Sequence, residues 1–283
     1  MPSMTTTSES PSLDVALKTL WGAKRWPGQA ESALVFEHPG WTQCMRGLDQ
    51  LVALHSSGVL HGPHGLGKSY LLHRWSEKLS SKQYRLIKLT HCSLAGGDLL
   101  RHLVRLAGRQ PKFRKSDNIS ELTETWREWA PAWPVLIVEE AQDLSVPSLE
   151  ELRLLTCART DAQQAFSLIL SGDDGLLPRL ELTINRALLS RMTSNLQLTP
   201  WPQKLLAEYL QEKLAESGIH GDILEPQAKT LLIQAAKGTP RMLNAVLQKA
   251  MEHAALDQRM KLTLADMQAG VNSVPWAAHG QIK

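Results

Sequence analysis

One segment of this sequence combines three glycines with a lysine and a serine at fixed spacing. It reads Gly62-Pro63-His64-Gly65-Leu66-Gly67-Lys68-Ser69 and fits G-x-x-x-x-G-K-[ST] at every fixed position. The glycines allow the backbone to curl, so that successive N–H groups converge on phosphate oxygens. A helix beginning at Ser69 would direct its positive end at the same anion. Lys68 would reach the β- and γ-phosphates of a nucleotide, and the Ser69 hydroxyl would coordinate Mg²⁺. The sequence therefore predicts a nucleotide site formed by residues 62–70, with Tyr70 as its last member.

Two carboxylates follow a later apolar run, Val135-Leu136-Ile137-Val138-Glu139-Glu140. The carboxyl end of a buried strand lies near the phosphates at the edge of a parallel sheet. Glu140 is the predicted general base or water-positioning group for attack on the γ-phosphate. Glu139 would hold Mg²⁺, directly or through water. The alternative is that both residues simply begin a solvated helix.

Further polar residues are candidates for the same site. The apolar run 166–170 precedes Ser171 and Asp173, and either could orient the attacking water. Arg186 and Arg191 follow in a helical region, where an arginine could reach the γ-phosphate of a neighbouring subunit. The alternative is that both are surface arginines.

Apolar runs separated by amphipathic helical patterns provide the framework for these residues. The five expected strands are 58–61, 85–89, 135–138, 166–170 and 195–198. This alternation predicts an α/β fold with a five-stranded parallel sheet flanked by helices. After Pro200 only helical spacing continues, over 202–216, 225–236, 239–256 and 263–270. We expect a tail at 1–12, a nucleotide-binding domain at 13–200, a helical lid at 201–272 and a tail at 273–283.

Composition narrows the class of protein. The 283 residues are 43% hydrophobic and 21% charged, which excludes a disordered or collagen-like chain. The three cysteines form no C-x-x-C pair, so a zinc knuckle is not indicated. Neither a signal peptide nor an apolar run of membrane-spanning length is evident. We therefore expect a cytoplasmic protein without a membrane partner.

Together these motifs resemble the AAA+ ATPases, and more narrowly the ExeA-like and TniB/TnsC-like group, over roughly residues 36–255. The resemblance is based on 62–69, on Val138-Glu-Glu-Ala-Gln142, on Leu188-Leu-Ser-Arg191-Met and on Gly238-Thr-Pro-Arg241. It implies ATP bound between subunits of a ring or filament. By this analogy Arg191 acts in trans and Arg241, at the start of a lid helix, is the second sensor. Glu139 stands where relatives usually have Asp, and 171–173 read Ser-Gly-Asp where relatives often have Gly-Gln-Pro.

The small net charge of +3 conceals two adjacent segments of opposite sign. Residues 81–116 hold nine basic residues and one acidic residue, whereas residues 117–151 hold nine acidic residues and one basic residue. Basic groups in the first segment would neutralise phosphates along double-stranded DNA with little sequence preference. The predicted DNA contacts are Arg105, Arg109, Lys112, Arg114 and Lys115. The alternative is a solvated helix face.

Three functions are compatible with these observations. The leading hypothesis is an ATPase that oligomerises with ATP on double-stranded DNA and recruits or regulates a transposase, as the resemblance implies. The second is a nucleotide-gated regulatory ATPase that acts on a protein partner. The third is a soluble ExeA-like accessory of a secretion system.

Overall fold

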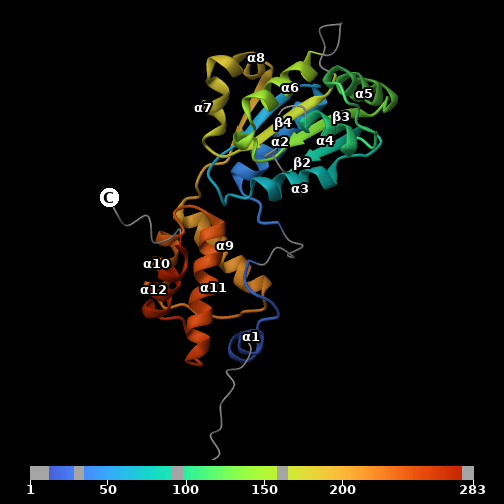
Figure 1. Ribbon diagram of the computed structural model, residues 1–283. Helices are drawn as coiled ribbons and strands as arrows, with labels where there is room; N and C mark the ends of the chain where they lie inside the picture. The colour runs from blue at the N-terminus through green and yellow to red at the C-terminus, as the bar shows by residue number, and fades with distance from the viewer. Residues whose placement is uncertain (1–12, 29–34, 91–97, 158–164, 276–283) are drawn as a thin grey trace, which may run out of the picture. The chain divides into compact units, whose positions relative to one another are not determined.

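The computed structural model describes residues 13–28, 35–90, 98–157 and 165–275. Its contacts divide the chain into two compact units. The first, here called the α/β unit, is continuous from Glu37 to Thr199. The second, the helical unit, combines the chain up to Phe36 with the chain from Pro200 onward. Figure 1 shows strands enclosed by helices in the α/β unit and helices alone in the other. The predicted tail 1–12 and most of the tail 273–283 lie outside the described residues.

A parallel sheet forms the centre of the α/β unit. Its strands are β1 (Ser57–His61), β2 (Tyr84–Leu89), β3 (Trp133–Val138), β4 (Ser167–Gly172) and β5 (Met192–Gln197). The strand order is β2-β3-β4-β1-β5, and every neighbouring pair is parallel. Because the strands are parallel, their carboxyl ends share one edge of the sheet. Only β4 separates the carboxyl end of β1 from that of β3.

Helices cover both faces of the sheet, as expected for strands that are apolar on both sides. They are α2 (Pro39–Ala53), α3 (Lys68–Lys78), α4 (Asp98–Leu106), α5 (Lys115–Glu128), α6 (Val146–Thr156), α7 (Leu176–Glu181) and α8 (Arg186–Leu189), with short 3-10 turns η1 (Ala141–Asp143) and η2 (Thr183–Asn185). Helices α4 to α8 share one buried apolar cluster with strand residues such as Val59, Leu136 and Leu168. On the opposite face, a Cβ added at Gly58 of β1 would come within 2.6 Å of Leu51 of α2. The sheet is thus the middle of three layers.

The helical unit comprises α1 (Leu13–Trp21), α9 (Gln203–Glu216), α10 (Pro226–Ala235), α11 (Pro240–Leu256) and α12 (Leu264–Ser273). Helix α11 packs on α12 and contacts α1. A capping box fixes the start of α12: the Thr263 hydroxyl accepts from the Asp266 N–H, and the Asp266 carboxylate accepts from the Thr263 N–H. The predicted α/β core followed by an all-helical region is therefore confirmed.

The structure corrects one predicted boundary. We expected the nucleotide-binding domain to begin at residue 13, but the chain up to Phe36 groups with the C-terminal helices. The Trp21 indole N–H donates to the Met260 carbonyl at 2.7 Å, which ties the end of α1 to the connection between α11 and α12. An amphipathic helix has an apolar face that must be buried, but its sequence does not say against which partner.

Several aromatic side chains of the acidic stretch 117–151 pack inside the α/β unit. Trp126 is buried, and its ring lies 4.4 Å from that of Phe166. Trp133 stacks on His55 at 3.7 Å and donates its N–H to the Ser167 hydroxyl. These tryptophans belong to the packing of the unit rather than to an exposed stacking surface.

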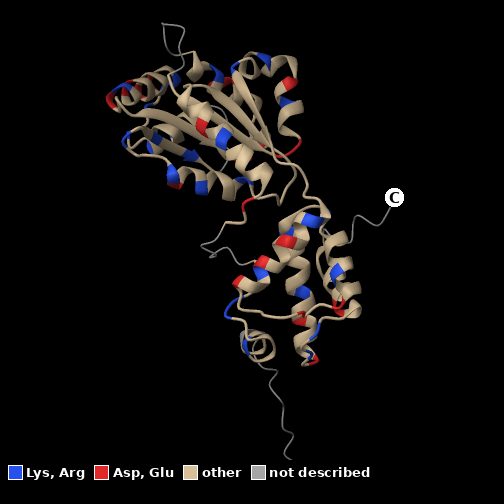
Figure 2. Ribbon diagram, turned by 180° about the vertical axis from the view of Figure 1, so that it is seen from behind, with Lys and Arg blue, Asp and Glu red and all other residues tan. Residues whose placement is uncertain are grey.

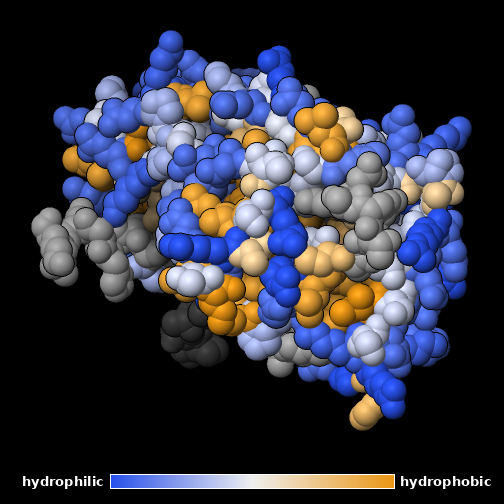
Figure 3. Space-filling model, turned by 90° about the horizontal axis from the view of Figure 1, so that it is seen from above, coloured by the Kyte–Doolittle hydropathy of each residue, from blue (hydrophilic) through white to orange (hydrophobic). Residues whose placement is uncertain are grey.

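The surface combines hydrophilic and apolar areas. Figure 3 shows apolar patches scattered among hydrophilic side chains on one face of the molecule. Of the large hydrophobic residues described in the α/β unit, four are more than half exposed: Leu54, Phe113, Leu182 and Ile184. Within the described residues, every helix is too short or too polar to cross a bilayer.

Candidate nucleotide-binding site

The phosphate-binding loop connects β1 to α3 and requires its glycines. Gly62, Gly65 and Gly67 have φ values of 148°, 84° and 89°. These values lie in the region that favours glycine, because a Cβ atom would collide with the backbone. A Cβ at Gly62 would also come within 2.1 Å of the Leu198 carbonyl oxygen. Any larger residue at 62 would therefore displace the loop or the end of β5.

The first turn of α3 has no side-chain cap. Its N-cap residue is Gly67, which carries no group that could accept from the N–H groups of the turn. An anion can accept those hydrogen bonds instead, assisted by the helix dipole. Lys68 is buried, and its Nζ donates to the carbonyls of Gly62 and Pro63 at 2.6 and 3.0 Å. The lysine is thus folded along the loop, and the Ser69 residue beside it is exposed.

The two predicted carboxylates lie at the carboxyl end of β3, on the same sheet edge as this loop. Glu139 is 6% exposed, and its Oε1 lies 2.8 Å from Lys88 Nζ on β2. Lys88 therefore neutralises a buried charge that would be costly alone. Sequence reasoning missed this lysine, because the β2–β3 pairing that brings it beside Glu139 is not visible in the motif.

Glu140 adopts a left-handed backbone conformation, with φ 49° and ψ 42°. Its Oε2 accepts a hydrogen bond from Gln142 Nε2 at 2.8 Å. The Gln142 Oε1 accepts in turn from the N–H of Asp173 at 3.2 Å. Asp173 follows β4, and its Oδ2 lies 3.1 Å from His64 Nε2 in the phosphate-binding loop. Ser171 is buried near the end of β4, opposite Leu60 of β1.

This arrangement fits a nucleotide with Mg²⁺. The fit rests on three observations: a glycine cradle that side chains would fill, an uncapped helix start, and carboxylates on the same edge of the sheet. The donor set is also appropriate, because Mg²⁺ prefers hydroxyl and carboxylate oxygens. Lys68 and the loop amides would hold phosphate, and Ser69 and Glu139 would hold the metal.

The predicted arginines have different surroundings. Arg186 is exposed on α8, and its Nε donates to the Glu181 carbonyl at 3.4 Å. Arg191 precedes β5 and contacts the Ala187 carbonyl and the sulfur of Cys157. Arg241 is exposed in the first turn of α11, in the helical unit. Arg186 and Arg191 thus belong to the α/β unit, whereas Arg241 belongs to the helical unit.

Most of the predicted DNA contacts are engaged in ion pairs. Arg109 pairs with Glu128, Lys112 lies 3.8 Å from Glu121, and Lys115 lies 3.1 Å from the buried Glu151. Figure 2 shows acidic and basic positions side by side along α5. Across the described ranges, the salt bridges include neither Arg105 nor Arg114, and both residues are exposed. The segments of opposite charge therefore neutralise each other in part.

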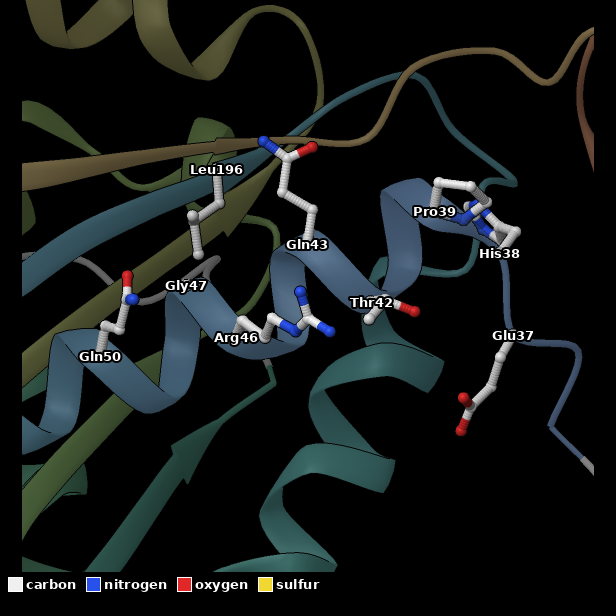
Figure 4. A pocket seen from close by; sticks show the side chains of 9 residues that line it. All are labelled: Glu37, His38, Pro39, Thr42, Gln43, Arg46, Gly47, Gln50 and Leu196. Carbon is white, nitrogen blue, oxygen red and sulfur yellow. The ribbon is translucent and has the colours of Figure 1, made fainter.

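A pocket of about 790 Å³ lies along α2. Its lining includes His38, Thr42 and Arg46, together with Leu196 of β5. Figure 4 shows Leu196 pointing at Gly47, where a Cβ would come within 2.4 Å of it. Burial lowers the pKa of the His38 imidazole. None of the lining residues belongs to 62–70 or to the carboxylates that follow β3. This pocket is therefore distinct from the candidate phosphate-binding site.

Comparisons with known proteins agree with this geometry. Residues 53–180 match the family model of the AAA domain. A curated protein from Aeromonas hydrophila, described as general secretion pathway protein A, is 32% identical over 117 residues. The match covers 41% of this chain and 21% of that protein, so it spans about a fifth of the relative's length.

Solved structures share the fold at low sequence identity. Cdc6p from Pyrobaculum aerophilum has a TM-score of 0.67 at 14% identity. The match covers 87% of this chain and 70% of the Cdc6p chain. The Aeropyrum pernix ORC1 protein in complex with DNA has a TM-score of 0.59 at 16% identity. The match covers 84% of this chain and 65% of the ORC1 chain. The Thermotoga maritima RuvB Holliday junction branch migration motor has a TM-score of 0.55 at 16% identity. The match covers 83% of this chain and 69% of the RuvB chain.

These likenesses and the parallel sheet show that the α/β unit has the P-loop AAA+ fold. They support the predicted resemblance to AAA+ P-loop ATPases and to the ExeA-like proteins. The resemblance to the transposition-associated group stays a prediction.

Proposed function

We propose that this chain binds ATP with Mg²⁺ and hydrolyses it to ADP and phosphate. The observation that carries the proposal is the shared sheet edge: the glycine-rich loop follows β1, and Glu139 and Glu140 follow β3 with only β4 between them. A phosphate held by the loop would therefore have two carboxylates within the same part of the unit. The match to the AAA domain over residues 53–180 supports this proposal.

Each residue has a defined task in the proposed reaction. The loop amides and Lys68 bind the β- and γ-phosphates and offset the charge that develops during transfer. Ser69 and Glu139 would hold the metal ion, which would supply Lewis-acid stabilisation of the phosphate oxygens. Glu140 orients a water molecule and accepts its proton. By the resemblance, Arg191 would act on the nucleotide of a neighbouring subunit, and Arg241 would serve as the second sensor.

Two variants test the proposed ATPase. Glu140→Gln removes the base but keeps the shape of the side chain, so we expect hydrolysis to fall on the order of 100-fold or more while ATP binding persists. Lys68→Ala should lose ATP binding itself. Hydrolysis by Glu140→Gln at the parental rate would show that another group activates the water.

We also propose that the protein oligomerises with ATP on double-stranded DNA and that it recruits or regulates a transposase. The motif set and the basic segment 81–116 support this proposal, as does the fold shared with an ORC1 protein in complex with DNA. Electron microscopy with ATP, with and without duplex DNA, tests it. We expect rings or filaments that require DNA or lengthen on it, and assemblies that ignore DNA would contradict it.

A second candidate is a nucleotide-gated ATPase that acts on a protein partner, including a secretion accessory. The four ion pairs between the basic and acidic segments favour it, because they reduce the charge available to DNA. The match to a general secretion pathway protein supports it as well. This candidate predicts nucleotide-dependent self-association and an ATPase rate that DNA does not change.

A further inference from the structure

Gln142 forms one hydrogen bond within the segment that follows β3 and one to the segment that follows β4. Its Nε2 donates to Glu140 Oε2 at 2.8 Å, and its Oε1 accepts from the N–H of Asp173 at 3.2 Å. A carboxylate can only accept, and a backbone N–H can only donate. The two partners therefore determine which end of the amide faces which group, and the amide satisfies both.

The space for this side chain is provided by a glycine. A Cβ added at Gly172 of β4 would come within 2.5 Å of Gln142 Oε1. Gly172 has an ordinary backbone φ, so conformational freedom is not what requires a glycine there. A side chain at this position would therefore have to displace the Gln142 amide.

Asp173 extends the connection to the phosphate-binding loop. Its Oδ2 lies 3.1 Å from His64 Nε2, and its Oδ1 accepts from the N–H of Gly175 at 2.9 Å. Hydrogen bonds thus link His64, Asp173, Gln142 and Glu140 in series. The series runs from the loop that would hold phosphate to the carboxylate that would activate water.

We propose that Gln142 is a positioning residue for ATP hydrolysis, which fixes the Glu140 carboxylate and connects it to the phosphate-binding loop through Asp173 and His64. This inference rests on the proposed ATPase activity. Gln142 engages Oε2 of Glu140, whereas Oε1 forms no hydrogen bond within the described residues and is the oxygen that would accept the proton. Holding a base in its reactive orientation lowers the barrier without contact to substrate.

The test compares Gln142→Leu, which keeps the approximate volume but can neither donate nor accept, with Gln83→Leu. Gln83 is an exposed residue before β2 and serves as the matched control. For Gln142→Leu we expect kcat to fall about 10-fold to 100-fold, with the dissociation constant for ATP changed less than about 2-fold. Gln83→Leu should retain parental values. A parental kcat in Gln142→Leu overturns the inference, and so does a higher one.

Amide hydrogen exchange gives a readout that does not depend on activity. In the nucleotide-free protein, Gln142→Leu should speed exchange in a peptide covering residues 171–176, because the Asp173 N–H loses its acceptor. Gln83→Leu should leave that peptide unchanged. Unchanged exchange in Gln142→Leu overturns the connection between β3 and β4.

A double-mutant cycle separates positioning from a general loss of structure. If Gln142 acts through Glu140, Gln142→Leu should slow the Glu140→Gln enzyme no further, whereas independent effects would multiply. A wild-type protein that binds ATP and hydrolyses none overturns the proposed function together with this inference. A wild-type ATPase with independent effects of the two substitutions overturns the positioning role alone.

Discussion

The phosphate-binding loop and the basic segment 81–116 are both conspicuous in the sequence. In the structure, the predicted property of the loop depends on local backbone geometry, whereas that of the basic segment depends on distant residues. The loop is defined by what its own backbone requires: positive φ at three glycines and a helix that begins without a side-chain cap. The charge of the basic segment depends on groups elsewhere in the chain. Lys88, Arg109, Lys112 and Lys115 each pair with a carboxylate from 117–151.

This difference shows which kinds of sequence pattern predict a functional property directly. A motif that specifies backbone geometry keeps its meaning after folding, because the geometry is local. A count of charges does not, since folding can pair each charge with a partner far along the sequence. Only the cations that remain outside ion pairs are fully available to phosphate. The comparison therefore directs attention to Arg105 and Arg114 within the predicted DNA-contacting set.

Lys68→Ala separates the two regions most strongly. We expect ATP binding to weaken at least about 100-fold, because the buried ammonium contacts the loop carbonyls and would face the phosphates. ATP-independent association with DNA at low salt should remain, since the basic segment is untouched. Fluorescent ATP titration and DNA anisotropy measure the two effects. Equal loss of both would mean that the regions are not separable.

Paired and unpaired cations give the second test. Arg105→Ala with Arg114→Ala should weaken DNA binding about 10-fold and lower the slope of log K against log salt by about 2. Arg109→Ala with Lys112→Ala, the matched control of equal charge change, should weaken it less than about 3-fold. If the control pair loses as much affinity, the ion pairs open on DNA and the distinction drawn from the structure fails.

Lys115→Met tests whether one basic residue serves the fold rather than a ligand. Lys115 Nζ lies 3.1 Å from Glu151, whose side chain is 1% exposed. Removing the cation leaves a buried carboxylate with less compensation, so we expect the free energy of unfolding to fall by about 1–3 kcal/mol. Urea unfolding followed by far-UV circular dichroism measures the change. A stability equal to that of the parent would mean that other groups suffice for Glu151.

Much of the fold could be predicted because the required signals are local. Strands β1 and β3 are almost entirely buried, and the sequence placed both within a few residues. The start of β5 was missed because its residues alternate between half-buried and exposed, which hides Met192 to Ser194 from a search for apolar runs. The assignment of α1 failed for a different reason: its partner α11 follows more than 200 residues later, and the sequence of an amphipathic helix does not identify its partner.

The contacts that sequence reasoning missed at the site all arise from the pairing of strands. Gln142 was visible as part of the Glu-Glu-Ala-Gln pattern, but its acceptor role toward Asp173 exists only because β3 pairs with β4. Lys88 reaches Glu139 only because β2 pairs with β3. His64 gained a partner in the same way, from the residue that follows β4. Motifs identify the groups that would contact a ligand. Strand pairing determines which other side chains fix those groups in position.

The smallest effect is expected at Lys112, and its size distinguishes a surface pair from a structural one. Lys112 Nζ lies 3.8 Å from Glu121, and the lysine side chain is about half exposed. Water and salt screen such a pair, so Lys112→Met should change the free energy of unfolding by less than about 0.5 kcal/mol. The difference should vanish in high salt, whereas that of Lys115→Met should persist because Glu151 is buried. If both variants respond equally to salt, burial of the carboxylate is not what separates the two lysines, and the basic segment would have to be treated as one solvated face.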